Sequence, residues 1–329
     1  MDRQGASTEL ANIPPAGALA PPLPPAAAAV LHQTPNAAFA ADEFFRASLS
    51  NEHTRRAYSR IAGRFLAWCA DQRLDLRQIT PGLAGEYIGR LAGSAPTKNQ
   101  ALAALRHFFD ALVQRHAVAL NPFASVRGIK YSVAEGKTAE LAIEQARKLF
   151  RAIAASHVVG LRDRAVLGVL AYTGARVGAV AKLRRADYRD LGGHRALRFR
   201  EKGGKEREIP VRHDLALWLD EYLAAAGLGG DAKGPLFRAA DGRRRVLTAA
   251  AYRAHSIRQM MKRRLQDAGL PELFSPHSFR VTVVTDLLNQ NVPLEDVQQL
   301  AGHASPTTTR VYDRRRRKIT RNIVERISI

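Results

Sequence analysis

The spacing of apolar residues between 41 and 120 is the feature that most constrains the fold. Three segments, beginning near positions 50, 80 and 97, each place apolar side chains three or four positions apart, as on one face of a helix. The stripes are Tyr58, Ile61, Phe65, Leu66 and Trp68; Leu83, Tyr87, Ile88 and Leu91; and Leu102, Leu105, Phe108, Phe109 and Leu112. They predict a small helical bundle.

The length of 329 residues allows two domains. We expect residues 41–126 to form the helical bundle, residues 127–138 to be a linker, and residues 139–329 to form a second domain. The linker prediction rests on the loss of helical spacing after Asn121-Pro122 and on the Gly, Lys and Ser content that follows.

The second domain is expected to be mostly α with a small antiparallel sheet. Alternating residues at 195–199 and a run at 208–211 predict strands on either side of a Lys-Gly-Gly-Lys turn. Helices are expected at about 143–156, 161–172, 213–226, 248–268, 277–290 and 293–301.

Residues 1–40 are rich in proline and alanine, and we expect them to be a disordered tail. Their most apolar stretch, 13–31, contains prolines that would break a membrane-spanning helix. It also lacks the basic region with which a secretory signal begins. No association with a membrane is expected.

Positive charge dominates the composition, with 51 Lys and Arg against 30 Asp and Glu, a net charge of +21. The first 40 residues carry a net −1, so the remainder holds the whole excess. A folded body with this charge favours a polyanionic partner, nucleic acid first. The one cysteine, Cys69, excludes a disulfide scaffold and a cysteine-based zinc site and fits a reducing compartment.

Several familiar kinds of site are missing from the sequence. It contains no Walker phosphate loop, no GxGxxG and no HExxH, and its histidines lack the neighbouring acids or cysteines of a typical metal site. No metal and no cofactor are therefore expected. Chemistry on DNA phosphates would depend on cations and a side-chain nucleophile.

Four local patterns supply such groups. In chain order they are Arg176 after a Thr-Gly-Ala turn, Lys202 in the turn between the strands, His277-x-x-Arg280, and Gly302-His303 nine residues before Tyr312. The histidine and arginine of the third pattern are three positions apart, so on a helix they share one face. Each pattern alone also fits an ordinary role, such as a helix cap or a solvated lysine.

Together, their order and spacing resemble the tyrosine recombinase (phage-type integrase) family, whose usual order is Arg, Lys, His-x-x-Arg, Gly-His and Tyr. The resemblance covers the chain from about residue 41 to its end. It implies a SAM-like helical core-binding domain that clamps DNA at 41–126, and an α+β catalytic domain at 139–329. The chain departs from the pattern at Ala179, where family members often have an acid, which leaves open what supports the helix after Arg176.

The resemblance implies that the enzyme cuts and rejoins DNA through a 3′-phosphotyrosyl intermediate, without metal or ATP. The implied roles are Tyr312 as nucleophile, Arg176 and Arg280 on the phosphate, His277 as acid or base, His303 as a hydrogen-bond donor, and Lys202 as the acid for the leaving oxygen. Guanidiniums suit this chemistry because they stay charged and bind phosphate oxygens in pairs. A tyrosine with an ordinary pKa of about 10 needs a base and cations nearby to attack at neutral pH.

The implied partner is double-stranded DNA with inverted-repeat half-sites, bound by a dimer at each site and a homotetramer in the synaptic complex. Isoleucines at 319, 323 and 327 form a stripe that docks either on a neighbouring subunit or on its own domain. The expected location is the bacterial cytoplasm, at the nucleoid. Two alternatives stay open: a type IB topoisomerase-like activity, and a non-catalytic DNA-binding protein of the same fold.

Overall fold

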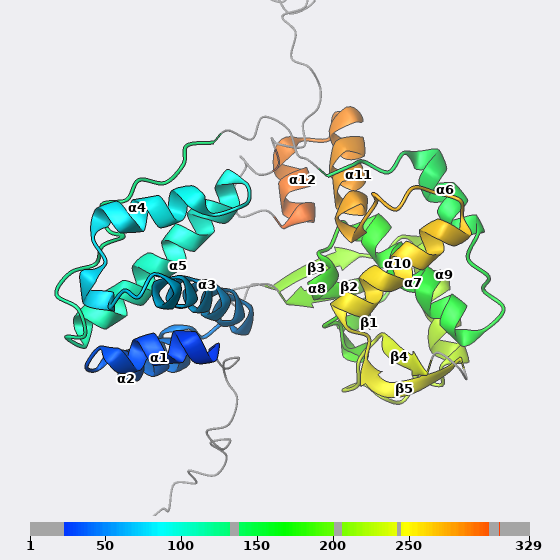
Figure 1. Cartoon of the computed structure of the whole chain (residues 1–329). Helices are drawn as coiled ribbons and strands as arrows, with labels where there is room; N and C mark the ends of the chain where they lie inside the picture. The colour runs from blue at the N-terminus through cyan, green and yellow to red at the C-terminus, as the bar shows by residue number, and fades with distance from the viewer. Residues whose placement is uncertain (1–22, 132–137, 201–205, 242–244, 303–308, 310–329) are drawn as a thin grey trace, which may run out of the picture. The chain divides into compact units, whose positions relative to one another are not determined.

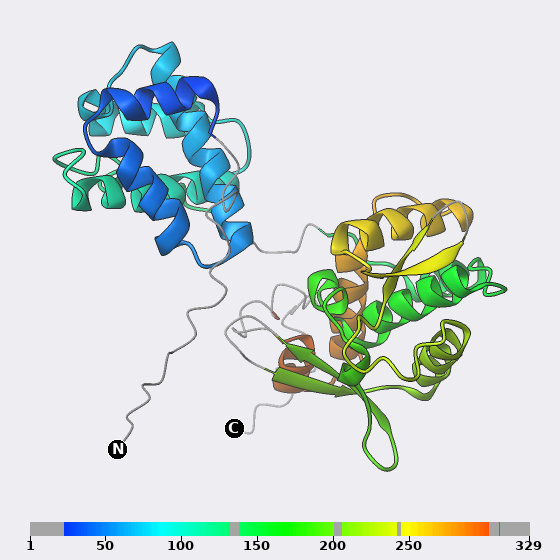
Figure 2. The same ribbon diagram turned by 90° about the horizontal axis from the view of Figure 1, so that it is seen from below.

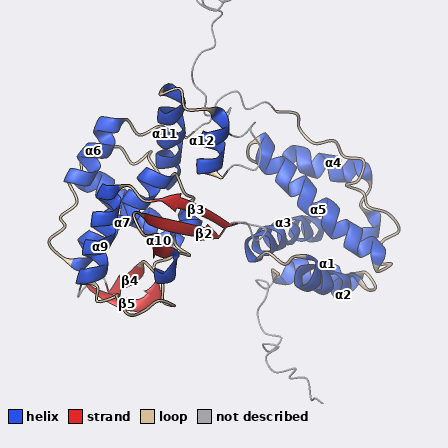
Figure 3. Ribbon diagram, turned by 180° about the vertical axis from the view of Figure 1, so that it is seen from behind, coloured by secondary structure: helices blue, strands red, loops and turns tan. Residues whose placement is uncertain are grey.

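The computed structural model describes residues 23–131, 138–200, 206–241, 245–302 and 309. The chain divides into two compact units, Met1–Ser132 and Val133–Ile329. Helices predominate in both, and the strands of the described part belong to the second unit (Figures 1 and 3). The mainly α architecture with small antiparallel sheets is confirmed. No helix in these ranges is both long and apolar enough to span a bilayer.

The first unit is a helical bundle built around aromatic side chains. Its helices are α1 (Pro25–Gln33), α2 (Ala37–Glu43), a π-helical turn η1 (Phe44–Ser48), α3 (Glu52–Asp71), a 3-10 turn η2 (Leu76–Gln78), α4 (Pro81–Arg90) and α5 (Ala95–Gln114). The Asn51 side chain accepts the backbone N–H groups of His53 and Thr54 and so starts α3. Phe65, on α3, packs edge-on against Phe109 of α5, so the predicted stripes do face one core.

The expectation of a disordered tail over 1–40 is wrong for its last part. Residues 25–33 and 37–43 are helical, and Val30 and Leu31 are buried in contact with α3. Pro25 stands at the first position of α1, where its missing N–H costs nothing, and the alanines that follow have high helix propensity. The prediction for residues 1–22 lies outside the described residues.

The second unit surrounds one buried helix. Its helices are α6 (Ile143–Arg151), α7 (Val158–Thr173), α8 (Val177–Val180), a 3-10 turn η3 (Arg185–Asp187), α9 (His213–Ala225), α10 (Ala254–Asp267), α11 (Pro276–Asn289) and α12 (Leu294–Ala301). Helix α7 is apolar on most of its faces and packs between α9 and α11. A Cβ at Gly160 would lie 1.9 Å from the carbonyl oxygen of Ala154, so the first turn of α7 requires glycine.

Two antiparallel sheets flank these helices. The first, in the order β1-β2-β3, contains β1 (Tyr188–Asp190), β2 (Arg195–Arg200) and β3 (Glu206–Pro210); the second pairs β4 (Arg238–Asp241) with β5 (Val246–Ala251). Figure 2 shows β2 and β3 side by side. Leu197 lies opposite Ile209 in the register, and both are buried, as the alternation predicted.

The helix expected at 248–268 begins six residues later than predicted. Residues 246–251 instead form β5, because their backbone groups pair with β4. The run of alanines at 249–251 favours a helix by propensity, and tertiary pairing overrides it. Likewise the helix expected at 143–156 ends at Arg151.

Candidate active site

The turn after α7 fixes the position of Arg176. Gly174 ends the helix in the left-handed conformation (φ 58°), which glycine adopts without steric cost. The Thr173 hydroxyl donates to the carbonyl oxygen of Val169 at 2.6 Å and accepts the N–H of Ala175 at 3.2 Å. The chain therefore turns sharply, and Arg176 becomes the residue that precedes α8.

Arg280 is held beneath the same turn. Proline at the first position of α11 starts that helix, and Arg280 lies one turn further, with only 2% of its surface exposed. Its Nη1 donates to the carbonyl oxygen of Gly174 at 2.8 Å. A buried guanidinium is costly unless it is hydrogen-bonded, so this contact fixes both the arginine and the turn that carries Arg176.

The carbonyl oxygen of Gly302, the last described residue before the predicted His303, contacts the first arginine. Gly302 ends α12 in the left-handed conformation (φ 63°), and its carbonyl oxygen lies 3.4 Å from Nη1 and 3.5 Å from Nη2 of Arg176. His303 follows directly in the chain but lies outside the described residues. The end of α12 is thus adjacent to the Arg176 guanidinium.

Arg176 and His277 line the same surface pocket, which has a volume of about 340 Å³. Its wall also includes Arg258 of α10, which the sequence analysis missed. Arg258 is one of several exposed cations on α10, and the spacing of the buried Ile257 and Met261 does not distinguish it from the others. Among the described residues, no group of three His, Cys, Asp or Glu side chains is placed to hold a metal ion.

The surroundings of His277 lower its pKa from the usual value. Partial removal from water is the main cause, and the positive charges of Arg280 and Arg176 add to it. All three effects penalise the imidazolium form. His277 is therefore neutral at pH 7 and able to accept a proton.

Three of the predicted site residues, Lys202, His303 and Tyr312, lie outside the described residues. Lys202 follows the last residue of β2 by two positions. Across the hairpin, Nη1 of Arg207 on β3 lies 3.5 Å from the carbonyl oxygen of Gln299 on α12. The structure thus brings together Arg176, His277, Arg280 and the end of α12, and ties β3 to the same helix.

Comparison with known proteins identifies the family. Residues 140–318 match the phage integrase family, and residues 44–116 match the phage integrase N-terminal SAM-like domain. The tyrosine recombinase XerC of Pelobacter propionicus is 31% identical over 278 residues, covering 82% of this chain and 88% of that protein. The tyrosine recombinase XerD of Ralstonia nicotianae is 29% identical over 303 residues, covering 88% and 91%.

Solved structures share the fold. The XerH site-specific recombinase bound to palindromic difH substrate, in a post-cleavage complex, aligns with a TM-score of 0.65 at 21% identity, covering 80% of this chain and 76% of that one. A lambda integrase dimer bound to a COC′ core site aligns with a TM-score of 0.61 at 18% identity, covering 85% and 78%. The chain belongs to the phage integrase family. It is a tyrosine recombinase, an enzyme that breaks and rejoins DNA, as the sequence predicted.

Proposed function

We propose that the Arg176 pocket holds the DNA phosphate that is cut, and that Tyr312 attacks it to form a 3′-phosphotyrosyl link. The observation that carries the proposal is that Arg176 and His277 line one pocket, while Arg280 bonds the Gly174 carbonyl two residues before Arg176 and the end of α12 contacts Arg176. No base-pair recognition is needed for this step, since the reacting group is a backbone phosphodiester.

The described residues suit the transition state. Attack by an oxygen nucleophile adds negative charge to the non-bridging phosphate oxygens, and Arg176 and Arg280 are fixed cations that meet it without reorganisation. His277, neutral at pH 7, accepts the tyrosine proton. His303 donates a hydrogen bond to the phosphate, and Lys202 protonates the departing 5′ oxygen. Because the phosphotyrosyl bond conserves the energy of the broken one, rejoining needs no ATP.

The proposed substrate is duplex DNA with two inverted half-sites, each filled by one subunit, with two such dimers forming a tetramer during strand exchange. Support comes from the similar structures, which include XerH on a palindromic substrate and a lambda integrase dimer on a core site. A two-fold symmetric dimer imposes inverted symmetry on its DNA. The proposed location is the bacterial cytoplasm, at the nucleoid.

The test is a covalent adduct on a nicked suicide substrate. The substrate is taken from DNA beside the gene that carries inverted repeats of about 10–13 bp around a short spacer. Wild-type protein should give a protein–DNA adduct that survives denaturation, and Tyr312→Phe should give none. The control is Tyr131→Phe, which changes an exposed tyrosine of the first unit and should leave the adduct unchanged. An adduct that persists in Tyr312→Phe refutes the nucleophile, and bound DNA without any adduct favours the non-catalytic alternative.

The protonation of His277 predicts the pH dependence of cleavage. Because the pKa of His277 lies below the usual value, the neutral base predominates at pH 7, and the single-turnover rate divided by Kd should fall only in the acidic range, as the imidazole gains a proton. His277→Gln should lower the rate by about 10²–10⁴ and remove this acidic limb. An acidic limb that is unchanged in His277→Gln would show that another group titrates.

The general acid is tested with a sulfur leaving group. Lys202→Ala should cut an ordinary phosphodiester poorly and a 5′-bridging phosphorothiolate well, because sulfur departs without a proton. Lys205→Ala changes the other lysine of the segment between β2 and β3 and should cut both substrates equally well. If the sulfur substrate instead rescues Lys205→Ala selectively, the general acid is Lys205 and not Lys202.

A further inference from the structure

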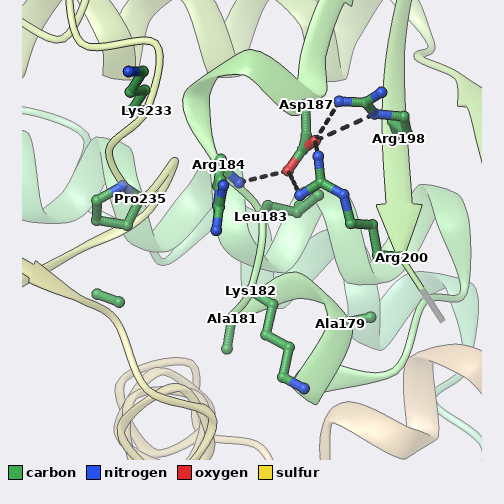
Figure 4. Close-up of a pocket in the computed structure, with 11 residues that line it drawn as sticks. Ala179, Ala181, Lys182, Leu183, Arg184, Asp187, Arg198, Arg200, Lys233 and Pro235 are labelled. Carbon is green, nitrogen blue, oxygen red and sulfur yellow. Dashed lines mark hydrogen bonds and ion pairs between the residues drawn. The ribbon is translucent and has the colours of Figure 1, made fainter. Parts of the chain in front are cut away.

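A second basic pocket, of about 460 Å³, lies in the catalytic unit and shares no lining residue with the Arg176 pocket. Its polar wall consists of Lys182, Arg184, Asp187, Arg198, Arg200 and Lys233. Figure 4 shows Arg198 and Arg200 reaching Asp187, with Lys182 and Lys233 at other points of the wall. The pocket is thus lined by five cations and a single carboxylate.

Asp187 organises two of these cations. The residue is 1% exposed, and its carboxylate accepts the Arg184 N–H at 2.8 Å and lies 3.3 Å from Nη2 of Arg198 and 3.1 Å from Nη2 of Arg200. The two arginine side chains are 29% and 45% exposed, so both remain accessible from solvent while Asp187 holds them. A buried carboxylate that holds two partly open guanidiniums pre-orients them for an anion.

The charge in the pocket is not balanced by its neighbours. Exposed Glu206 lies 3.4 Å from Arg200 and 3.9 Å from Arg198, which still leaves an excess of three positive charges. Lys182, Arg184 and Lys233 form no ion pair with any residue in the described ranges. Separate lysine and arginine donors arranged around one space suit the several oxygens of a phosphate better than the two of a carboxylate.

The position of the pocket indicates which phosphate it takes. Ala179 lines it and belongs to α8, the one-turn helix that follows Arg176, and Arg200 is two residues before Lys202. One turn of helix is about 5.4 Å, and successive phosphates of a strand are about 3.4 Å apart along the DNA axis. Because Gly178 lines the Arg176 pocket and the next residue, Ala179, lines this one, a strand whose phosphate occupies the first pocket passes close to the second.

The residue at 179 strengthens the inference for this particular chain. Ala179 lines the pocket, and an acidic side chain at this position would neutralise one of its cations. Alanine leaves both the space and the positive charge. We propose that this pocket binds a backbone phosphate of the cut DNA strand, next to the phosphate that is cleaved. The proposal rests on the proposed function only for the identity of that strand.

The test measures how the affinity for a non-specific duplex depends on salt, using the full-length chain. Lys182→Ala/Lys233→Ala removes two exposed side chains that form no described ion pair, and it should reduce the slope of log K against log salt by about 0.9 for each phosphate that is no longer neutralised. Lys148→Ala, an exposed lysine of α6 outside the pocket, is the control and should leave the slope unchanged. Ala179→Glu should reduce the slope in the same direction, and Ala179→Ser should not.

A second arm separates DNA from a small phosphate compound. Inorganic phosphate and pyrophosphate are titrated against wild type and the double lysine variant by calorimetry. Binding of either ion that requires Lys182 and Lys233, with an unchanged DNA slope, would overturn the DNA assignment. An unchanged slope without such binding would overturn the site itself. Both readouts are independent of cleavage, so a wild-type protein that forms no adduct would contradict the proposed function and leave the pocket to be judged by its slope.

Discussion

Replacing either arginine of the candidate site is expected to abolish most cleavage while DNA binding persists. Arg176→Ala and Arg280→Ala should each lower the single-turnover cleavage rate by about 10²–10³, or roughly 3–4 kcal/mol, because each removes a fixed cation from the charge that develops on the phosphate. Their Kd values should change little, since each arginine supplies one of many phosphate contacts. The measurements are suicide-substrate cleavage and a gel-shift titration of the same DNA.

Controls separate an effect on chemistry from an effect on structure. Arg280 also bonds the Gly174 carbonyl from a buried position, so Arg280→Ala is accompanied by Arg280→Lys, which keeps the charge and removes the planar fork. Arg147→Ala removes an exposed, ion-paired arginine of α6 and should leave cleavage unchanged. If Arg176→Ala abolishes DNA binding together with cleavage, its role is in binding and the assignment is wrong.

Asp163→Ala is expected to destabilise the catalytic unit by about 3–5 kcal/mol, because it leaves the buried guanidinium of Arg162 without a counter-charge. The Asp163 carboxylate is 1% exposed and lies 2.7 Å from Nη2 of both Arg162 and Arg264, and it ties α7 to α10. The Arg162 guanidinium also lies 3.9 Å from the ring centre of Tyr252, and Arg162 is itself 2% exposed. The melting temperature of this unit should fall by roughly 10 °C or more in calorimetry.

The matched comparison is an exposed pair of similar chemistry. Glu52 and Arg56 form an ion pair one turn apart on the surface of α3, and Glu52→Ala should cost less than about 1 kcal/mol. Asp163→Asn keeps the shape and should fall between the two. A melting temperature for Asp163→Ala that matches the one for Glu52→Ala would mean that the buried network contributes nothing to stability.

The sequence was sufficient for those parts of the fold that depend on local pattern. The stripe around Phe65 predicted α3 because residues three or four positions apart lie on one face of a helix. The alternation around Leu197 predicted β2 because alternate residues of a strand lie on one face of the sheet. Arg176, His277 and Arg280 were predicted as site residues from the order and spacing of their motifs and the family resemblance these carry, and the structure places the three near one another.

Features that depend on distant contacts escaped prediction. The prolines before Val30 suggested a tail, yet that helix is stabilised by packing against α3, a distant contact that the local pattern of residues 1–40 does not reveal. The strand at 246–251 exists only because β4 pairs with it. Similarly, the bond from Arg280 to Gly174 spans 106 positions, and the presence of Arg258 in the pocket follows from how α10 packs.

The most direct test of the account is to identify the residue that carries the DNA. Wild-type protein is trapped on the suicide substrate, the DNA is trimmed with nuclease, and the tryptic peptides are sequenced by mass spectrometry. The account predicts one modified peptide, with a 3′-linked nucleotide on Tyr312. A nucleotide on any other side chain would contradict it.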